Sequence, residues 1–154
     1  MQIKELSVDI ETYCDVDLRK TGVYRYAEDE SFEILLLAVS INNAPVIVYD
    51  LTKDELPNLI LQALLDDTVI KWAFNATFER ICLSNWIKKH YPTLLNENFL
   101  SPNSWRCSMI WSAYLGLPLS LEGVGTILKL SEQKLKVGSE LIRYFCLPCK
   151  PTKI

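Results

Sequence analysis

Two carboxylates one residue apart, Asp9 and Glu11, lie at the end of a short apolar-alternating stretch near the start of the chain. Residues i and i+2 of a β-strand point to the same face, so a strand over residues 3–10 would direct both carboxylates to one place. Crowded carboxylates repel each other unless a positive charge lies between them, and a divalent cation is the usual solution. The spacing indicates a candidate metal site, although acidic residues also often simply end a strand.

A second polar group, Asn75 and Glu79, follows a predicted strand over residues 68–73 and opens a predicted helix over residues 76–89. An Asn and a carboxylate at the start of a helix can also serve as caps, so a structural role stays open for both. The metal interpretation gains support from the pairing of the two groups, because the spacing allows both strand ends to lie side by side.

The elements that would position these residues follow from the apolar pattern. A continuous apolar run over residues 34–41, a turn at 42–45 and a returning strand over 46–50 predict a β-hairpin. The pattern Thr-x-x-Glu at Thr52 has the form of a capping box and predicts an amphipathic helix over residues 53–66.

The remaining segments complete an α/β order. Residues 15–33 are expected to be irregular and residues 92–104 to form a polar loop, followed by helices over about 106–115, 120–129 and 138–146. Strands that alternate with helices, together with one hairpin, predict an α/β fold with a mixed sheet.

Length and composition indicate one globular domain over residues 1–154, with 49% hydrophobic and 23% charged residues. The sequence shows no membrane-spanning run and no signal peptide, so we expect a cytoplasmic protein without a membrane partner. Five cysteines cannot all pair, which favours free thiols in a reducing compartment.

Charge is distributed unevenly along the chain. Residues 1–67 hold five Lys or Arg and fourteen Asp or Glu, whereas residues 68–154 hold eleven basic and five acidic residues. An acidic front beside a basic back suits a protein that binds cations next to a polyanion, although a salt-bridged surface has the same counts.

Both motifs resemble those of a known family. Residues 9–12 (Asp-Ile-Glu-Thr) are similar to the first motif of the DEDD 3′–5′ exonucleases, the proofreading domains of DNA polymerases, and residues 75–79 are similar to the second, Asn-x-x-(Phe/Tyr)-Asp. Residues 22–36, 115–121 and 136–142 also resemble the amino-terminal exonuclease region of phage-type family A DNA polymerases. The resemblance covers nearly the whole chain.

The resemblance implies a ribonuclease H-like mixed β-sheet flanked by helices, and hydrolysis of the 3′-terminal phosphodiester of single-stranded DNA with two Mg²⁺ or Mn²⁺ ions about 4 Å apart. It implies that Asp9 bridges both ions, that Glu11 binds one ion and positions water, and that Glu79 supports the second ion. In the same way, it implies that the terminal nucleotides are contacted by three further residues: Thr12, Asn75 and Phe78.

Two departures from the family pattern stand out. Glu79 replaces the usual Asp, and the third motif, a Tyr-x-x-x-Asp or His-x-x-x-x-Asp that supplies the fourth carboxylate, is missing, because no Asp follows Asp67. We interpret the chain as truncated before the helix that carries this motif, and expect little or no exonuclease activity from it alone. Apolar surface exposed by the truncation would allow a homodimer.

Three alternatives stay open. The chain could be a non-cleaving module that grips single-stranded nucleic acid, a ribonuclease on the same fold, or an inactive remnant. The first would use aromatic residues for base stacking, although Trp111 lies on an apolar helical face where a core position is commoner; the aromatic residues are Trp72, Phe74, Phe78, Trp105 and Trp111.

Overall fold

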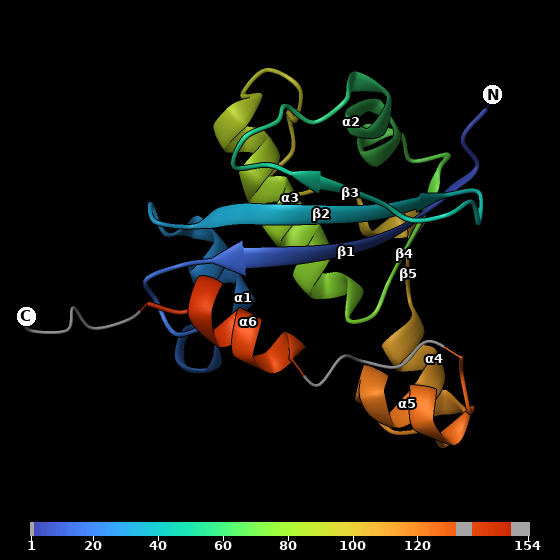
Figure 1. Cartoon of the computed structure of the whole chain (residues 1–154). Coiled ribbons are helices and arrows are strands. Elements are labelled where there is room, and N and C mark those ends of the chain that lie inside the picture. The colour runs from blue at the N-terminus through green and yellow to red at the C-terminus, as the bar shows by residue number, and fades with distance from the viewer. Residues whose placement is uncertain (1, 132–136, 149–154) are drawn as a thin grey trace, which may run out of the picture.

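The computed structural model describes residues 2–131 and 137–148, so residue 136 of the third polymerase-like segment lies outside the described residues. Its strands form one mixed sheet in the order β3-β2-β1-β4-β5 (Figure 1). The strands are β1 (Glu5–Tyr13), β2 (Glu33–Ile41), β3 (Ile47–Asp50), β4 (Ile70–Ala73) and β5 (Trp105–Cys107). The central strand β1 is antiparallel to β2 and parallel to β4, which confirms the predicted mixed α/β sheet.

Strand β1 separates the core from the acidic residues by simple alternation. Leu6, Val8 and Ile10 are buried on one face, whereas Asp9 is exposed and Glu11 is half-buried on the other. The apolar face therefore fixes the register of β1, since a slip by one residue would bury the carboxylates.

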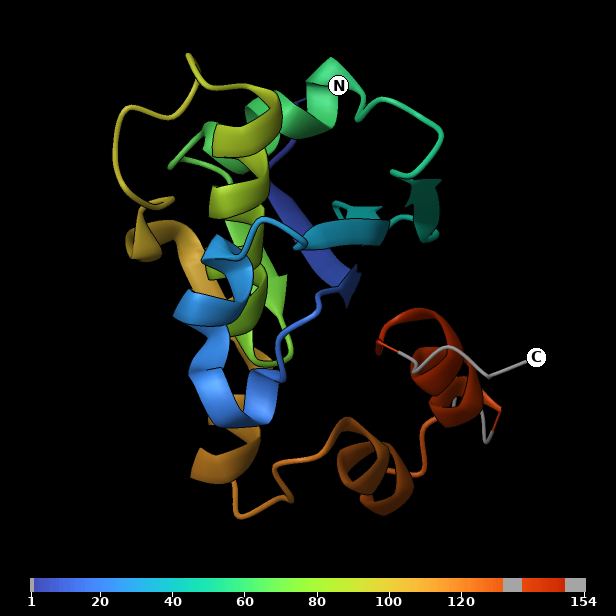
Figure 2. The same cartoon turned by 90° about the vertical axis from the view of Figure 1, so that its left-hand side faces the viewer.

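Some of the helices cover the apolar face of the sheet, and one lies on its other side. The helices are α1 (Leu18–Glu28), α2 (Asn58–Leu65), α3 (Ala76–His90), a 3₁₀ turn (Pro102–Ser104), α4 (Ser108–Tyr114), α5 (Leu121–Ile127) and α6 (Gly138–Phe145). Helix α3 lies against the sheet with Ile81, Leu83 and Ile87 fully buried, and α1 packs beside it. Helix α6 lies on the opposite side of β1 from α3 (Figures 1 and 2).

Helix α1 occupies a stretch that we expected to be irregular, so that expectation was wrong. Asp17 caps the helix by accepting a hydrogen bond from the backbone of Arg19, and Tyr26 and Ala27 are buried. Gly22 interrupts the helix with a φ of 74°, a backbone conformation that glycine adopts without strain. This kink divides α1 into two short turns, and the helical period in the sequence is lost for the same reason.

The capping box predicted at Thr52 is absent from the described fold, and the helix begins six residues later, at Asn58. Instead, the hydroxyl of Thr52 donates a hydrogen bond to Asp50 and forms part of a turn. Pro57 precedes the helix and cannot donate a backbone hydrogen bond, while Leu56 is buried; together they hold residues 52–57 outside the helix.

Strand β5 was also missed, because we expected a helix from about residue 106. Residues 105–107 are extended and pair in parallel with β4, and α4 begins only at Ser108. A three-residue strand is too short to show a periodic pattern, so its conformation depends on the partner strand.

Within the described residues, no helix is long and apolar enough to cross a membrane.

Ser84 ties α3 to the segment that leads into β5. Its hydroxyl donates to the carbonyl of Arg80 at 2.6 Å and accepts from the backbone N–H of Leu100 at 2.9 Å, and the residue is fully buried. We expect Ser84→Ala to lower the free energy of unfolding by about 1–3 kcal/mol, because the buried N–H of Leu100 loses its acceptor. Urea denaturation measures this loss.

Ser40→Ala is the matched control, since the Ser40 hydroxyl donates a single exposed hydrogen bond to Ala44. We expect that variant to stay within about 0.5 kcal/mol of the wild type. Equal midpoints for the two variants would contradict the structural role given to Ser84.

Candidate metal centre

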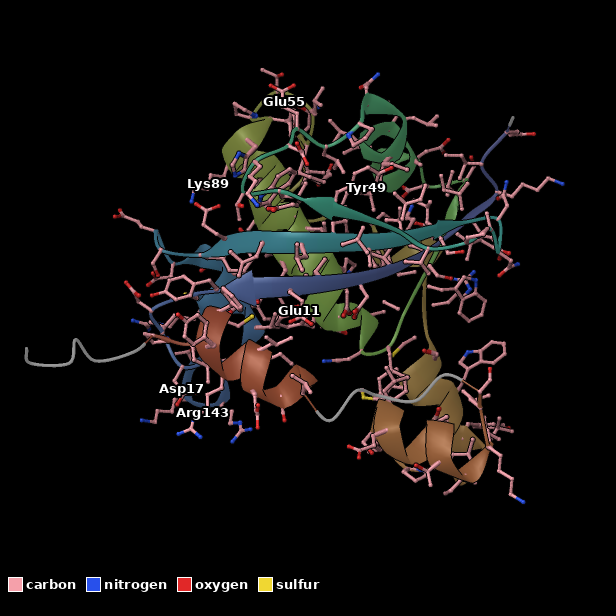
Figure 3. All side chains as sticks on the ribbon, viewed as in Figure 1. Glu11, Asp17, Tyr49, Glu55, Lys89 and Arg143 are labelled. Carbon is pink, nitrogen blue, oxygen red and sulfur yellow. The ribbon has the colours of Figure 1, made fainter. Side chains whose placement is uncertain are left out.

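Asp9 and Glu11 lie on the open face of β1, opposite Ala38 and Leu36 of β2. The pairing register shifts between Glu11 and Thr12, and such an irregularity bends a strand and re-aims its side chains. Figure 3 shows Glu11 on the side of β1 that faces α6. The alternation along β1 therefore places both carboxylates on the same face of the strand.

Glu79 lies in the first turn of α3 and is only 4% exposed. Its Oε2 atom is buried and has no hydrogen-bond partner among the described residues. Burial, with a smaller contribution from the nearby charge of Asp9, raises the pKa of Glu79 to about 8. The structure thus brings Glu79 within electrostatic reach of Asp9.

Asn75 precedes α3 in a left-handed conformation, with a φ of 77°, and makes no side-chain capping hydrogen bond. Its side chain is exposed, and its carbonyl accepts the backbone N–H of Phe78 at 2.8 Å. Asn75 therefore occupies the N-cap position of α3 and caps the helix through its backbone carbonyl rather than its side chain. Its amide lies at the surface beside the helix start.

Thr12 and Phe78 are linked through Tyr26 of α1. The hydroxyls of Thr12 and Tyr26 lie 2.9 Å apart in a buried hydrogen bond, and the Tyr26 ring centroid lies 6.3 Å from that of Phe78. Burial raises the pKa of Tyr26 to about 12, so the phenol stays protonated. Sequence analysis missed Tyr26 because it lies in the stretch for which no helix was predicted.

Cys146, directly after α6, lies against the other carboxylate of β1. Its thiol donates a hydrogen bond of 3.8 Å to Oε2 of Glu11. Burial raises the pKa of the thiol, and the charge of Glu11 raises it further. No sequence pattern indicated this contact, which joins residues far apart in the chain.

The three carboxylates are only partly gathered. The charge of Asp9 acts on Glu79, whereas Glu11 accepts a hydrogen bond from the thiol of Cys146. Within residues 2–131 and 137–148, no group of three His, Cys, Asp or Glu side chains could hold a metal ion. The donor chemistry still fits a divalent cation. Carboxylate oxygens are the ligands of Mg²⁺, and a buried, unpartnered Glu79 oxygen beside a second carboxylate is the kind of charge that a cation stabilises.

The aromatic candidates differ in exposure. Trp105 is buried, which leaves it a structural role, and Phe78 packs against the core. Trp111 is 57% exposed, so the core position considered for it is wrong.

No protein-family model matches the chain. The chain is 49% identical over 152 residues to the DNA polymerase of Bacillus phage SP02, a match that covers 98% of this chain and 22% of the polymerase. The chain therefore spans less than a quarter of the length of that relative.

Solved exonuclease structures share the fold at low identity. Brucella melitensis NrnC bound to pGG has a TM-score of 0.56 at 17% identity, covering 88% of this chain and 56% of NrnC. NrnC with bound Mg²⁺ has a TM-score of 0.56 at 15% identity, covering 93% and 65%. Trypanosoma brucei RNase D in complex with RNA U12 has a TM-score of 0.55 at 14% identity, covering 90% and 44%. These likenesses confirm the predicted ribonuclease H-like fold.

The raised pKa of Glu79 makes stability depend on pH. The folded state holds a proton that the unfolded chain releases near pH 4.5, so the contribution of Glu79 is fully present below that pH and is lost as the pH rises towards 8. We expect Glu79→Gln, measured in a chelator, to raise the free energy of unfolding at pH 8.5 by on the order of a few kcal/mol, and to have little effect at pH 4.

Glu97→Gln, in an exposed loop, is the control and should leave the pH profile unchanged. Parallel pH profiles for the wild type and Glu79→Gln would show that the carboxyl of Glu79 titrates normally.

Proposed function

The chain is a homologue of a phage DNA polymerase and has the fold of the DEDD-type exonucleases; from this premise we propose that it is the 3′–5′ exonuclease (proofreading) portion of such a polymerase. The observation that carries the proposal is the buried carboxyl of Glu79, whose Oε2 has no hydrogen-bond partner among the described residues and which lies near Asp9. This pair lies where β1 and the start of α3 meet, and it costs folding energy unless a cation compensates it.

We propose that Mg²⁺ or Mn²⁺ is held by the carboxylates of Asp9, Glu11 and Glu79. When bound, such ions stabilise the attacking and leaving oxygens of the phosphodiester. Support comes from the oxygen-only donor set and from NrnC, a neighbour in fold whose structure contains Mg²⁺. For Glu11 to join the other two carboxylates, its contact with Cys146 has to open.

The proposed substrate is the 3′ end of a single DNA strand. Asn75 presents its amide beside the start of α3, and Phe78 lies one turn further along, so both would contact the terminal nucleotide. Thr12 is buried, and its hydroxyl is hydrogen-bonded to that of Tyr26. Its proposed role is therefore to support Phe78 through Tyr26, and not to contact the nucleotide with its hydroxyl.

A ribonuclease is the second candidate, because NrnC and RNase D were solved with pGG and with RNA U12. The sequence favours DNA, since the chain is 49% identical to a DNA polymerase and only 13–17% identical to these nucleases.

The family's fourth carboxylate is not supplied by this sequence, in which no Asp follows Asp67. We therefore propose that residues 1–154 alone bind the 3′ end in a cation-dependent way but hydrolyse it weakly. A ligand set without one carboxylate holds its ions less tightly and orients water less well.

The test compares the affinity of the chain for a single-stranded dT oligonucleotide in Mn²⁺ and in a chelator. We expect Mn²⁺ to tighten binding about tenfold or more in the wild type, equivalent to about 1.4 kcal/mol, and to have no such effect in Asp9→Asn. Asp54→Asn removes an exposed carboxylate elsewhere and should behave like the wild type.

Hydrolysis is followed in the same samples. Equal affinity with and without Mn²⁺, and no cleavage, would favour the non-cleaving module over the exonuclease. Rapid release of mononucleotides that Asp9→Asn abolishes would overturn only the proposed weakness of the isolated chain.

We further propose a homodimer through the apolar side chains of α6, which has no buried residue among those described. Tyr144 is 77% exposed, and Leu141 and Phe145 are also exposed, so pairing would remove apolar area from water. We expect sedimentation to show a dimer in the wild type and a monomer when Tyr144 and Phe145 are both replaced by Ser. A wild type that stays monomeric at high concentration would contradict the proposal.

A further inference from the structure

An indole pair lies on the same face of the sheet as the candidate carboxylates. Trp72 of β4 is the register partner of Ser7 in β1, and residues paired in this way point to the same side. Ser7 precedes Asp9 by two residues and shares its open face. Strand geometry therefore places Trp72 about 8 Å from Asp9 along the sheet.

Trp111 of α4 completes the pair. Its ring centroid lies 5.4 Å from that of Trp72, with an interplanar angle of 80°, an edge-to-face contact. The contact fixes the orientation of the Trp111 indole although the residue is 57% exposed. An exposed indole in a fixed orientation is an available stacking surface.

A positively charged side chain, Arg106, lies next to the indole pair. Arg106 of β5 is the register partner of Trp72 and is half-buried. Its Nη1 atom donates to the carbonyls of Asn103 and Trp105, at 2.8 and 2.9 Å, which holds the planar guanidinium close to the strand. Guanidinium groups bind phosphate oxygens, and indoles stack on bases.

We propose that Trp72, Trp111 and Arg106 form a binding subsite for the nucleotides that precede the 3′-terminal one, with Trp111 stacking on a base and Arg106 contacting a phosphate. The subsite rests on the proposed function, because it assumes that the terminal phosphodiester lies at Asp9. A strand anchored there would continue along the open face of the sheet, across β4 towards β5.

The occupant is a single nucleic-acid strand rather than a protein. The three side chains present an aromatic surface and a guanidinium group beside a pair of carboxylates. A nucleic-acid strand has a matching partner for each: a base for the indoles, a phosphate for the guanidinium, and a metal-bound end for the carboxylates. An apolar protein surface would have no partner for the guanidinium of Arg106.

The test measures affinity for two probes, thymidine 5′-monophosphate and a dT oligonucleotide, in Mn²⁺. We expect Trp111→Ala to weaken oligonucleotide binding about tenfold or more, to leave binding of the monophosphate unchanged, and not to alter the fold, since the side chain is largely exposed. Trp111→Phe should recover most of the affinity because it keeps an aromatic face. Tyr24→Ala removes a half-exposed aromatic ring of α1 and serves as the control.

The outcomes separate this inference from the proposed function. A wild type that binds neither probe would refute the proposed function itself. A wild type that binds both, with Trp111→Ala unchanged, would overturn the subsite alone. An equal loss for both probes would place the effect at the carboxylates, and an altered sedimentation mass with unchanged affinity would make Trp111 part of a protein interface; either result overturns the subsite.

Discussion

Burial of the Glu79 carboxyl beside Asp9 is the constraint on which the site depends. The protein brings a charge and a carboxyl group together at the junction of β1 and α3, and it leaves the inner oxygen without a hydrogen bond within the described residues. Burial alone disfavours the charged form of Glu79, and the macrodipole of α3 offsets only part of that cost. The pair is held in place by the core beneath it, in which alternate residues of β1 and one face of α3 are fully enclosed.

Different residues surround this pair on its covered side and on its open side. On the covered side, Tyr26 of α1 contacts both Thr12 and Phe78, so α1 supports the residues beneath the site. On the open side, the thiol of Cys146 donates a hydrogen bond to Glu11, while the two indoles and a guanidinium extend the face towards β5. Binding of a cation therefore competes with one weak thiol contact and compensates the burial of the Glu79 carboxylate.

The sequence predicted those parts of this arrangement that follow from the periodic spacing of apolar residues within a single strand or helix. Alternation in β1 placed Asp9 and Glu11 on one face, and the apolar spacing of residues 76–89 placed Glu79 in the first turn of a helix, as the structure has them. The missed parts depend on tertiary contacts. Helix α1 is divided at Gly22, β5 exists only as a partner of β4, and the contacts of Tyr26 and Cys146 join segments far apart in the chain.

The position of β1 at the centre of the sheet also governs the order of assembly. It precedes the other described strands in the chain, and its two neighbours are β2, which follows soon after, and β4, which is paired in parallel across a long connection. Non-local parallel pairing is slow, because loop-closure entropy is lost before the contacts form. On the ribosome, β1 and β2 can form a ribbon early, but Asp9 meets Glu79 only after β4 and the start of α3 have emerged. The burial of Glu79 beside Asp9 is therefore completed only after β4 has joined β1.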